Sequence, residues 1–309
     1  MRTILIQPDV IGADEFRKIL SAGLTDFHIA LSIEDVELLD IEVVVMWLYV
    51  PDFISRLPNL KLLLICGSGV DHIIASPYLP HNIPLIRLVD PLLQKHVSDY
   101  VVEQIFEHFF PEINHKNQEE ALHMFFKAVE RKKPRIGIMG LGLVGSSTAQ
   151  KLVDMDFEVC GWVKSSKPRC IKEVYVGNEE LIDFAKKCEV IVCQLPLTKE
   201  TKGILNTHLF SHLSNGAFLI NVGRGAHLIE ADLLLALEMG KLSGACLDVF
   251  EVEPLPSDHF FHAHPKIKIT PHVAGYVTPG TQAPYAAQII ASYYKNEKTT
   301  GVVDYFSLY

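Results

Sequence analysis

The chain has 309 residues, of which 49% are hydrophobic and 21% are charged, and its formal net charge is −9. This length suits two domains, and the composition is that of a globular protein rather than a disordered one. The acidic balance argues against nucleic acid as a partner, because a phosphate backbone binds basic surfaces. It leaves small anionic ligands open, since a few local basic residues are enough for those.

No apolar stretch approaches the roughly 18 residues that a membrane span requires. At the N-terminus, Pro8 and Asp9 interrupt the apolar residues too early for a signal peptide. No two cysteines form a CxxC pair, and most lie in apolar stretches, as is typical of buried, reduced thiols. We therefore expect a cytoplasmic protein without membrane contact. The six cysteines are Cys66, Cys160, Cys170, Cys188, Cys193 and Cys246.

The first hundred residues alternate short apolar runs, rich in branched side chains, with amphipathic segments such as residues 13–22. Such runs are typical of buried parallel strands, and the segments between them are typical of helices. The alternation predicts a flavodoxin-like α/β unit. Its predicted strands are residues 4–6, 27–30, 43–47, 62–65 and 84–88.

A helix is predicted over residues 97–110, where Val101, Ile105 and Phe109 recur at helical spacing before Pro111. The more charged stretch after it leads into a second unit in which apolar runs and helical patterns alternate again. This alternation predicts a second parallel sheet with covering helices. Its predicted strands are residues 135–139, 157–162, 190–195, 217–222, 245–249 and 267–270.

The second unit has predicted helices over 179–187 and 230–239, and a last helical pattern covers about 283–295. No strand follows that last helix, so we expect it to pack on the first unit. The prediction is therefore an α/β protein of two Rossmann- or flavodoxin-like domains. Residues 1–98 and 276–309 form the discontinuous first domain, and residues 99–275 form the inserted domain.

Residues 140–145, GLGLVG, lie between a predicted strand and the helical pattern 144–153. In that context the first glycine permits a tight turn and the second lets the backbone approach a pyrophosphate. The third lets helix and strand pack closely, so that the helix N-terminus faces the anion. The alternative is a glycine turn without a ligand. The predicted dinucleotide contacts are Gly140, Gly142, Leu143, Val144 and Gly145.

The loop after the next predicted strand bears on the choice of cofactor. About 20 residues beyond the glycine turn, an NAD-binding domain usually places Asp or Glu, which accepts from the ribose 2′-hydroxyl. Here the loop from Trp162 to Lys167 reads WVKSSK and has no carboxylate. Lys164, Ser165 and Lys167 suit a 2′-phosphate, so we expect NADP as the preferred cofactor and NAD as the other. An ordinary solvated loop is the alternative, since lysine is common on surfaces.

Polar groups follow three predicted strands of the second unit: Arg224, then Asp248 and Glu253, then His272. Open α/β sheets bind ligands beyond the carboxyl ends of their strands. An arginine, a carboxylate and a histidine are what reduction of a 2-oxo acid requires. The arginine fixes a carboxylate and polarises a carbonyl, the histidine delivers a proton, and the acid orients the histidine. Taken singly, each could be a surface acid or a hydrogen-bonded loop histidine.

Two more segments, residues 66–71 (CGSGVD) and 195–201 (LPLTKET), accompany the glycine turn and the three strand ends. The whole set resembles the D-isomer-specific 2-hydroxyacid dehydrogenases, and the similarity spans most of the chain. Arg87 followed by Asp90, the basic residues after Trp162 and the chain length resemble the glyoxylate/hydroxypyruvate reductase A branch of that family. The resemblance implies an NAD(P)-dependent oxidoreductase that reduces a small 2-oxo acid to the D-2-hydroxy acid.

By this resemblance Arg224 binds the substrate, His272 is the acid/base, Glu253 is its partner and Asp248 lies near the nicotinamide. The backbone amides of residues 69–70 hold the substrate carboxylate. The implied substrate-binding residues are Trp47, Gly67, Ser68, Gly69, Val70, Arg224 and His272. The implied further cofactor contacts are Leu195, Pro196, Thr201, Val222, Gly223, Arg224, Asp248 and His272.

The resemblance also implies a homodimer that pairs through its cofactor domains, and a substrate that enters a cleft between the two domains. Cys66 and Ser68 replace the commoner small residues of the substrate loop, and Gly275 and Tyr276 follow the TPHVA segment. These departures leave the reaction intact and the exact substrate open.

A metal site is not expected, because His259, His262 and His264 lack an adjacent cysteine or an HExxH framework. Two alternative functions stay open beside the reductase. One is a phosphoglycerate-dehydrogenase-like enzyme, which would share the chemistry. The other is a non-catalytic, nicotinamide-sensing interaction protein on the same fold.

Overall fold

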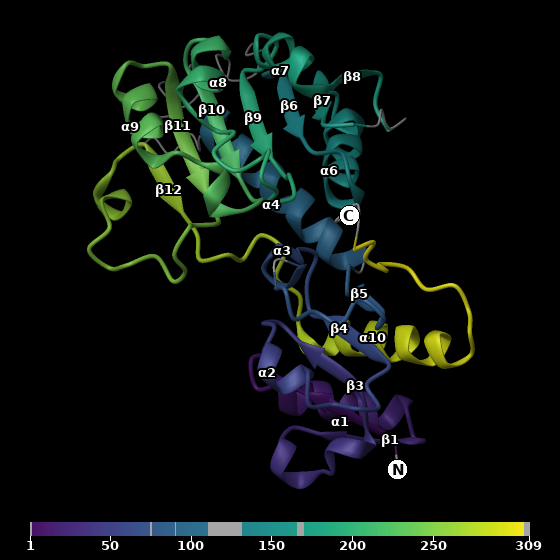
Figure 1. Ribbon diagram of the computed structural model, residues 1–309. Helices are drawn as coiled ribbons and strands as arrows, with labels where there is room; N and C mark the ends of the chain where they lie inside the picture. Colours follow the sequence, from purple (N-terminus) through teal and green to yellow (C-terminus); the bar gives the residue numbers. More distant parts are fainter. Residues whose placement is uncertain (1, 75, 90, 111–131, 166–169, 306–309) are drawn as a thin grey trace, which may run out of the picture. The chain divides into compact units, whose positions relative to one another are not determined.

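The computed structural model describes residues 2–74, 76–89, 91–110, 132–165 and 170–305 (Figure 1). Unit 1 comprises Met1–Leu93 and Val277–Tyr309, and unit 2 comprises Gln94–Tyr276. The division after Leu93 falls inside the continuous helix α4 (Pro91–Phe109). This helix begins earlier than the predicted 97–110, because a proline is accommodated in the first helical turn, where its missing N–H is not needed.

Unit 1 is built on a five-stranded parallel sheet in the order β2-β1-β3-β4-β5. The strands are mainly apolar, and β4 is entirely so, as expected for a sheet covered on both faces. The strands are β1 (Arg2–Ile6), β2 (Phe27–Ala30), β3 (Ile41–Met46), β4 (Leu62–Ile65) and β5 (Leu85–Arg87). The helices are α1 (Ala13–Gly23), α2 (Pro51–Ile54), α3 (Asp71–Ile74) and α10 (Pro279–Tyr294), with short 3-10 turns η1 (Ile33–Asp35) and η2 (Leu38–Asp40).

Alternate residues of the unit 1 strands point to opposite faces of the sheet. Val43 and Val45 of β3 belong to one buried cluster with Phe16 of α1 and Ala286 of α10. Val44, between them, belongs to the cluster on the other face, which α2 and α3 complete. The prediction that the last helix packs on the first unit is therefore confirmed.

Unit 2 is built on a seven-stranded parallel sheet in the order β12-β11-β10-β9-β6-β7-β8. The strand order reverses between β6 and β9, which is where such sheets bind ligands. The strands are β6 (Ile136–Met139), β7 (Val159–Val163), β8 (Glu173–Val176), β9 (Val190–Cys193), β10 (Ala217–Asn221), β11 (Leu242–Leu247) and β12 (Ile267–Ile269). The other elements are α4, α6 (Leu143–Asp154), α7 (Gly177–Ala185), α8 (Thr207–His212), α9 (Glu230–Glu238), η3 (Gly225–His227) and η4 (Phe260–Ala263).

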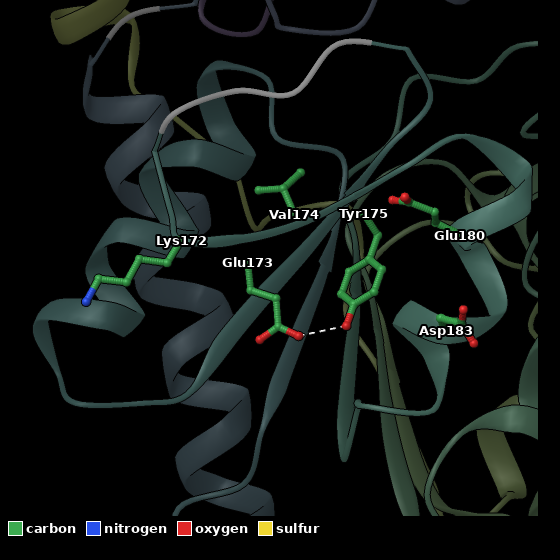
Figure 2. Close-up of a pocket in the computed structure, with 6 residues that line it drawn as sticks. All are labelled: Lys172, Glu173, Val174, Tyr175, Glu180 and Asp183. Carbon is green, nitrogen blue, oxygen red and sulfur yellow. Dashed lines mark hydrogen bonds between the residues drawn. The ribbon is translucent and has the colours of Figure 1, made fainter.

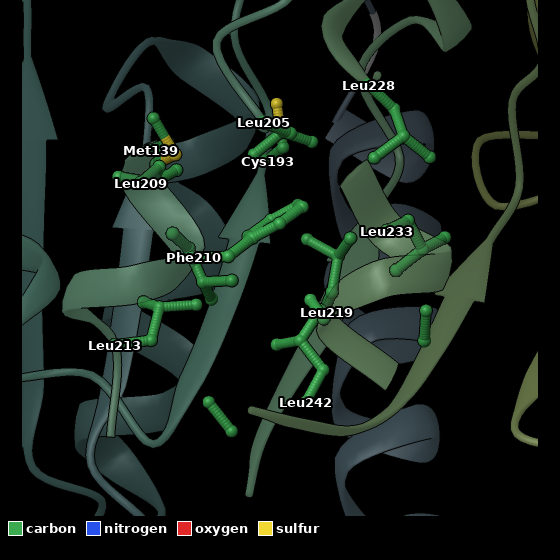
Figure 3. Packing of buried hydrophobic residues seen from close by; sticks show 14 of the residues in the cluster. Met139, Cys193, Leu205, Leu209, Phe210, Leu213, Leu219, Leu228, Leu233 and Leu242 are labelled. Atoms are coloured by element: carbon green, nitrogen blue, oxygen red, sulfur yellow. The ribbon is translucent and has the colours of Figure 1, made fainter. Parts of the chain in front are cut away.

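Helices cover both faces of the unit 2 sheet. Helices α8 and α9 contribute Phe210 and Leu233 to a cluster that includes Leu219 of β10 (Figure 3). On the opposite face, Val101 of α4 and Leu152 of α6 pack with the sheet. The two parallel sheets, each covered by helices, confirm the predicted two-domain α/β class.

Some features of unit 2 differ from the expectation or lie beyond it. Strand β8 is not predicted from the sequence, because an edge strand with polar Glu173 has no continuous apolar run.

Among the described residues no helix combines the length and apolar character needed to cross a membrane. The six cysteines are free thiols, and four of them are buried.

Candidate active site

The glycine turn connects β6 to α6 at the carboxyl edge of the unit 2 sheet. Gly140 has a φ of 95°, in the left-handed region that favours glycine. A Cβ on Gly145 would lie 1.8 Å from the Gly140 carbonyl oxygen, so the helix packs directly on the turn. A Cβ on Gly142 would meet nothing within 4 Å, and no side chain caps the helix at this residue. The first backbone N–H groups of α6 therefore face open space, as anion binding requires.

A buried acceptor lies beside this turn. The Gln194 amide nitrogen donates to Thr148 Oγ1 at 3.0 Å, whereas Gln194 Oε1 is buried and has no hydrogen-bond partner among the described residues. That oxygen lies 3.5 Å from the position that a Cβ of Gly145 would take. The oxygen is enclosed by protein atoms, so Gln194 supports the turn through its bond to Thr148 of α6. The uncapped helix N-terminus at Gly142, with Gly145 packed on Gly140, is the part of the turn that fits the pyrophosphate of a dinucleotide.

The loop after β7 holds Lys164 and Ser165, both exposed, whereas Ser166 and Lys167 lie outside the described residues. Lys164 Nζ lies 3.1 Å from Glu200 Oε1, which follows β9. The Thr198 hydroxyl, the Glu200 backbone and Lys164 together lower the pKa of Glu200 to about 2. The loop after β7 has no carboxylate of its own, but Glu200 places one beside Lys164. Glu200 reaches it from the segment after β9, on the other side of β6 in the sheet.

Three strand ends of unit 2 meet around His272. The His272 Nδ1 donates to Glu253 Oε2 at 2.8 Å, and the Phe250 N–H donates to Glu253 Oε1 at 2.8 Å. Burial raises the pKa of Glu253, but the hydrogen bonds from His272 and Phe250 and the charges of His272 and Arg224 outweigh it, so this pKa is lowered. A Cβ on Gly225, the residue after Arg224, would lie 1.9 Å from the Phe250 carbonyl carbon, so the turn that follows Arg224 packs directly on the loop that leads to the ionised Glu253.

Asp248 lies beneath the turn that carries His272. Its carboxylate is buried and accepts from Thr270 Oγ1 at 2.6 Å and from the N–H groups of Val273 and Ala274, both at 2.9 Å. The His272 backbone in this turn has a φ of 54°, which is unusual for a non-glycine residue. The three hydrogen bonds to Asp248 hold the backbone in that shape. The proximity of Asp248 to the nicotinamide stays a prediction.

Thr270 connects this carboxylate to helix α4. Its hydroxyl hydrogen is donated to Asp248, so Tyr100 Oη donates to Thr270 Oγ1, at 2.6 Å. Burial is the main cause that raises the pKa of Tyr100, which keeps the phenol protonated as this donor role requires. Tyr100 is not indicated by any sequence motif, because it lies 170 residues from Thr270.

Arg224 follows β10 and is held by its own backbone. Asn221 Nδ2 donates to the Arg224 carbonyl at 3.0 Å, and Arg224 Nη1 donates to the Gly223 carbonyl at 2.8 Å. The Arg224 N–H donates to Nδ1 of the buried His227 at 3.0 Å. His227 is a second residue that the sequence motifs do not single out.

The predicted substrate loop belongs to unit 1 and is described within that unit. A Cβ on Gly67 would lie 2.2 Å from Trp47 Cζ3, so only glycine leaves room for the indole ring. Asp9 Oδ2 accepts from the Trp47 N–H at 2.9 Å, and Arg87 Nη1 donates to the Ser68 carbonyl at 3.1 Å. The loop and the tryptophan are thus packed against each other, as one preformed surface. Gly69 and Val70 are buried beside it.

Two pockets of unit 2 have different surroundings. One, of about 430 Å³, borders the hydrogen-bonded pair of His272 and Glu253 and has mainly apolar walls. It is lined by Phe250, Glu253, Pro254, Leu255, His262, Ile269, Thr270, Pro271 and His272. The other, of about 400 Å³, lies at β8 and α7 (Figure 2) and holds none of the predicted site residues. It is lined by Lys172, Glu173, Val174, Tyr175, Glu180 and Asp183.

The three histidines of the 259–264 loop do not converge on one point. His259 Nε2 lies 3.3 Å from Glu230, and His262 Nε2 donates to the Pro256 carbonyl at 3.1 Å. Within the part of the chain that the structure describes, no group of three His, Cys, Asp or Glu residues could hold a metal ion.

Comparisons with known proteins bear on the family and the fold of the chain. Residues 107–274 match the sequence model of the D-isomer specific 2-hydroxyacid dehydrogenase, NAD binding domain. A D-isomer specific 2-hydroxyacid dehydrogenase from Xanthobacter autotrophicus Py2, crystallised with NADPH, is 29% identical with a TM-score of 0.85, over 100% of this chain and 99% of that chain. A probable 2-hydroxyacid dehydrogenase from Rhizobium etli CFN 42, in complex with NADP, is 30% identical with a TM-score of 0.83, over 100% of both chains.

A third solved structure carries a more specific description. It is an NADPH-dependent glyoxylate/hydroxypyruvate reductase from Sinorhizobium meliloti in complex with NADP and sulfate, and it is 31% identical with a TM-score of 0.82 over 100% of both chains. The match to an NAD binding domain, together with the glycine turn at the carboxyl edge of the parallel sheet, places the chain among the nicotinamide-dependent oxidoreductases. The chain belongs to the D-isomer specific 2-hydroxyacid dehydrogenase family.

Proposed function

We propose that this protein reduces a small 2-oxo acid of the glyoxylate or hydroxypyruvate type to the D-2-hydroxy acid, with NADPH preferred over NADH. The observation that carries the proposal is the hydrogen-bonded pair of His272 and Glu253, with the charge of Arg224 close enough to lower the pKa of Glu253. The solved reductase from Sinorhizobium meliloti supports the substrate class, and the NADPH and NADP bound to three similar structures support the cofactor.

NADPH, when bound, supplies the hydride to the carbonyl carbon and leaves as NADP⁺. The chain's own residues handle the charge and the proton. Arg224 binds the substrate carboxylate and stabilises the negative charge that develops on the carbonyl oxygen. The His272 ring turns Nδ1 toward Glu253, so its Nε2 protonates that oxygen. The ionised Glu253 stabilises the imidazolium before the transfer.

The cofactor contacts are proposed to divide between the turn before α6 and the loop after β7. The helix α6 N-terminus and Gly142 hold the pyrophosphate, and Lys164 and Ser165 meet the 2′-phosphate. In unit 1, we propose that the amides of Gly69 and Val70 bind the substrate carboxylate and that Trp47 lines the pocket. The tight fit of Trp47 over Gly67 supports a shared role for these residues.

We further propose that the protein is a cytoplasmic homodimer. The six free thiols suit a reducing compartment, and the family resemblance supports pairing through the cofactor domains. Light scattering at micromolar concentration decides the oligomeric state. A mass near the 34.6 kDa of one chain contradicts the dimer, and twice that mass supports it.

The test of the proposed activity is a panel of 2-oxo acids assayed with NADPH and with NADH by loss of absorbance of the reduced cofactor. Glyoxylate and hydroxypyruvate should give the highest kcat/KM, and NADPH should exceed NADH with both. A higher kcat/KM for oxidation of a phosphorylated 2-hydroxy acid, measured in the reverse direction, would support the phosphoglycerate-dehydrogenase-like alternative. Cofactor binding without any turnover would support the nicotinamide-sensing alternative.

A further inference from the structure

We infer that His227 is a positioning residue for Arg224. Its imidazole links the backbone of Arg224 to the Pro196 carbonyl in the 195–201 segment. This inference rests on the proposed function, in which Arg224 binds the substrate. His227 ends the 3-10 turn η3, which begins directly after Arg224, and its side chain is fully buried. A buried imidazole must have its polar atoms satisfied inside the protein, so its contacts are specific.

The two ring nitrogens of His227 have fixed and opposite roles. The Arg224 N–H, 3.0 Å from Nδ1, can only donate, so Nδ1 presents its lone pair. The Pro196 carbonyl, 3.3 Å from Nε2, can only accept, so Nε2 carries the proton. Both partners are main-chain groups that do not titrate. The geometry therefore requires the neutral ring with its proton on Nε2, because a proton on Nδ1 would face the Arg224 N–H.

The surroundings of the ring reinforce this arrangement. The Cys193 Sγ at the end of β9 lies 3.6 Å from Nδ1, and burial raises the pKa of Cys193 to about 12, which keeps it an uncharged thiol. A Cβ on Gly223 would lie 3.0 Å from His227 Nδ1 and 3.2 Å from the Leu195 carbonyl. The glycine at position 223, which has no side chain, thus leaves room for the imidazole to pack close to the 195–201 segment.

The Pro196 carbonyl is itself fixed. It also accepts from Thr201 Oγ1, at 2.7 Å, within the 195–201 segment. The imidazole therefore connects a rigid anchor after β9 to the residue after β10 that carries the substrate-binding guanidinium. Because Arg224 is the N-cap residue directly before η3, a change in its N–H direction rotates the whole side chain. His227 acts through Arg224 and does not touch the substrate in this account.

The ring geometry can be tested without any activity. In the uniformly ¹⁵N-labelled protein, His227 is assigned as the histidine whose ring signals disappear in the His227→Asn variant. We expect a pyridine-type resonance for Nδ1 and a pyrrole-type resonance for Nε2. A proton on Nδ1, either in the other tautomer or in an imidazolium, overturns the inferred link. This result is independent of which substrate the enzyme uses.

The functional part of the inference is tested with three variants that separate the two hydrogen bonds. His227→Asn places an amide oxygen where Nδ1 accepts from Arg224, His227→Gln places an amide nitrogen where Nε2 donates to Pro196, and His227→Leu removes both. With hydroxypyruvate and NADPH, the leucine variant should lose about 10- to 100-fold in kcat/KM, because a buried N–H is left without its acceptor. The asparagine variant should recover to within about threefold of wild type, and the glutamine variant should stay as low as leucine.

The split between kinetic constants separates positioning from general damage. The KM for the 2-oxo acid should rise in the leucine and glutamine variants, while the KM for NADPH changes less. His108→Leu is the matched control, since His108 is a packed histidine of unit 2 that stacks on Phe218 with 3.9 Å between ring centroids. The control should stay within about twofold of wild type in kcat/KM.

Equal loss in the asparagine and leucine variants, or recovery with glutamine instead of asparagine, overturns the positioning role. If the leucine variant does not fold, the comparison of asparagine with glutamine decides. If the wild type reduces no 2-oxo acid, the proposed function fails and so does the positioning role that rests on it. The nitrogen spectrum then still decides whether the imidazole links Arg224 to Pro196.

Discussion

His272 Nδ1 lies 2.8 Å from Glu253 Oε2, and the other oxygen of that carboxylate is held at 2.8 Å by the Phe250 N–H. Both carboxylate oxygens are therefore fixed, and the imidazole ring is oriented by its partner. Although burial by itself raises the pKa of Glu253, the two hydrogen bonds and the nearby positive charges lower it below the ordinary 4.5. Glu253 is ionised throughout the neutral range, so a negative charge lies beside the His272 ring.

The Glu253→Gln variant should remain active, with its pH optimum for reduction moved to lower pH by about one unit. The reason is that reduction needs a protonated His272, and the glutamine no longer favours the imidazolium. Since the lowered pKa keeps Glu253 ionised above about pH 4.5, the wild-type profile near neutrality has no limb from this acid. Initial rates across pH 5–9 measure the shift. An unchanged profile removes Glu253 from the mechanism.

The hydroxyl of Thr270 should matter for both stability and rate. Thr270→Val leaves Asp248 one donor short and leaves Tyr100 only the weaker Cys246 Sγ at 3.1 Å, so the free energy of unfolding should fall by roughly 1–3 kcal/mol. The kcat should fall with it, because Asp248 holds the turn that carries His272. Thr270→Ser keeps the hydroxyl and is the control. Denaturant unfolding and kcat measured on both variants decide, and equal behaviour of the two contradicts the role of the hydroxyl.

Two glycines of the cofactor turn should respond differently to alanine. Gly145→Ala places a methyl group 1.8 Å from the Gly140 carbonyl oxygen, so it should destabilise the fold. Gly142→Ala meets no atom within 4 Å, so its midpoint of thermal unfolding should stay close to that of wild type. Its KM for NADPH should nevertheless rise about tenfold, because the methyl group stands where the pyrophosphate approaches. Unchanged NADPH binding in Gly142→Ala would place the cofactor elsewhere.

Lys164 should give the enzyme its preference for NADPH, and Glu200 should limit it. The 3.1 Å ion pair is exposed, so a 2′-phosphate must compete with a weakly held carboxylate. Lys164→Ala should reduce the ratio of kcat/KM for NADPH to that for NADH by about tenfold. Glu200→Gln should raise the same ratio by a few fold, because the lysine loses its competitor. Ratios that do not move in either variant contradict the assignment of this loop to the 2′-phosphate.

The parts of this protein that can be predicted from its sequence are those whose cause is local. The turn at residues 140–145 can be predicted because glycines at this spacing, between a strand and a helix, are typical of a dinucleotide-binding turn. The buried strands can be predicted from their continuous apolar runs. Strand β8 does not follow, because Glu173 and Tyr175 interrupt its apolar character.

The contacts that complete the site come from residues far apart in the chain. Lys164 and Glu200 are brought together only by the order of β7, β6 and β9 in the sheet. His227 and Pro196 are 31 residues apart, and their contact depends on how β9 and β10 pair. The loop with Lys164, which has basic but no acidic residues in the sequence, therefore has the acidic neighbour Glu200 in the fold. His227, which belongs to no motif, likewise links the segments that contain Arg224 and Pro196.

Arg224, Glu253 and His272 are proposed to carry out the reduction of a small 2-oxo acid. The most direct measurement is steady-state kinetics of wild type, Arg224→Ala and His272→Ala with hydroxypyruvate and NADPH. His272→Ala should lose roughly 10²- to 10⁴-fold in kcat with little change in KM, since it removes the proton donor. Arg224→Ala should lose in both constants, because it removes a contact to the substrate and to the developing charge. A His272→Ala variant with wild-type kcat would contradict the account.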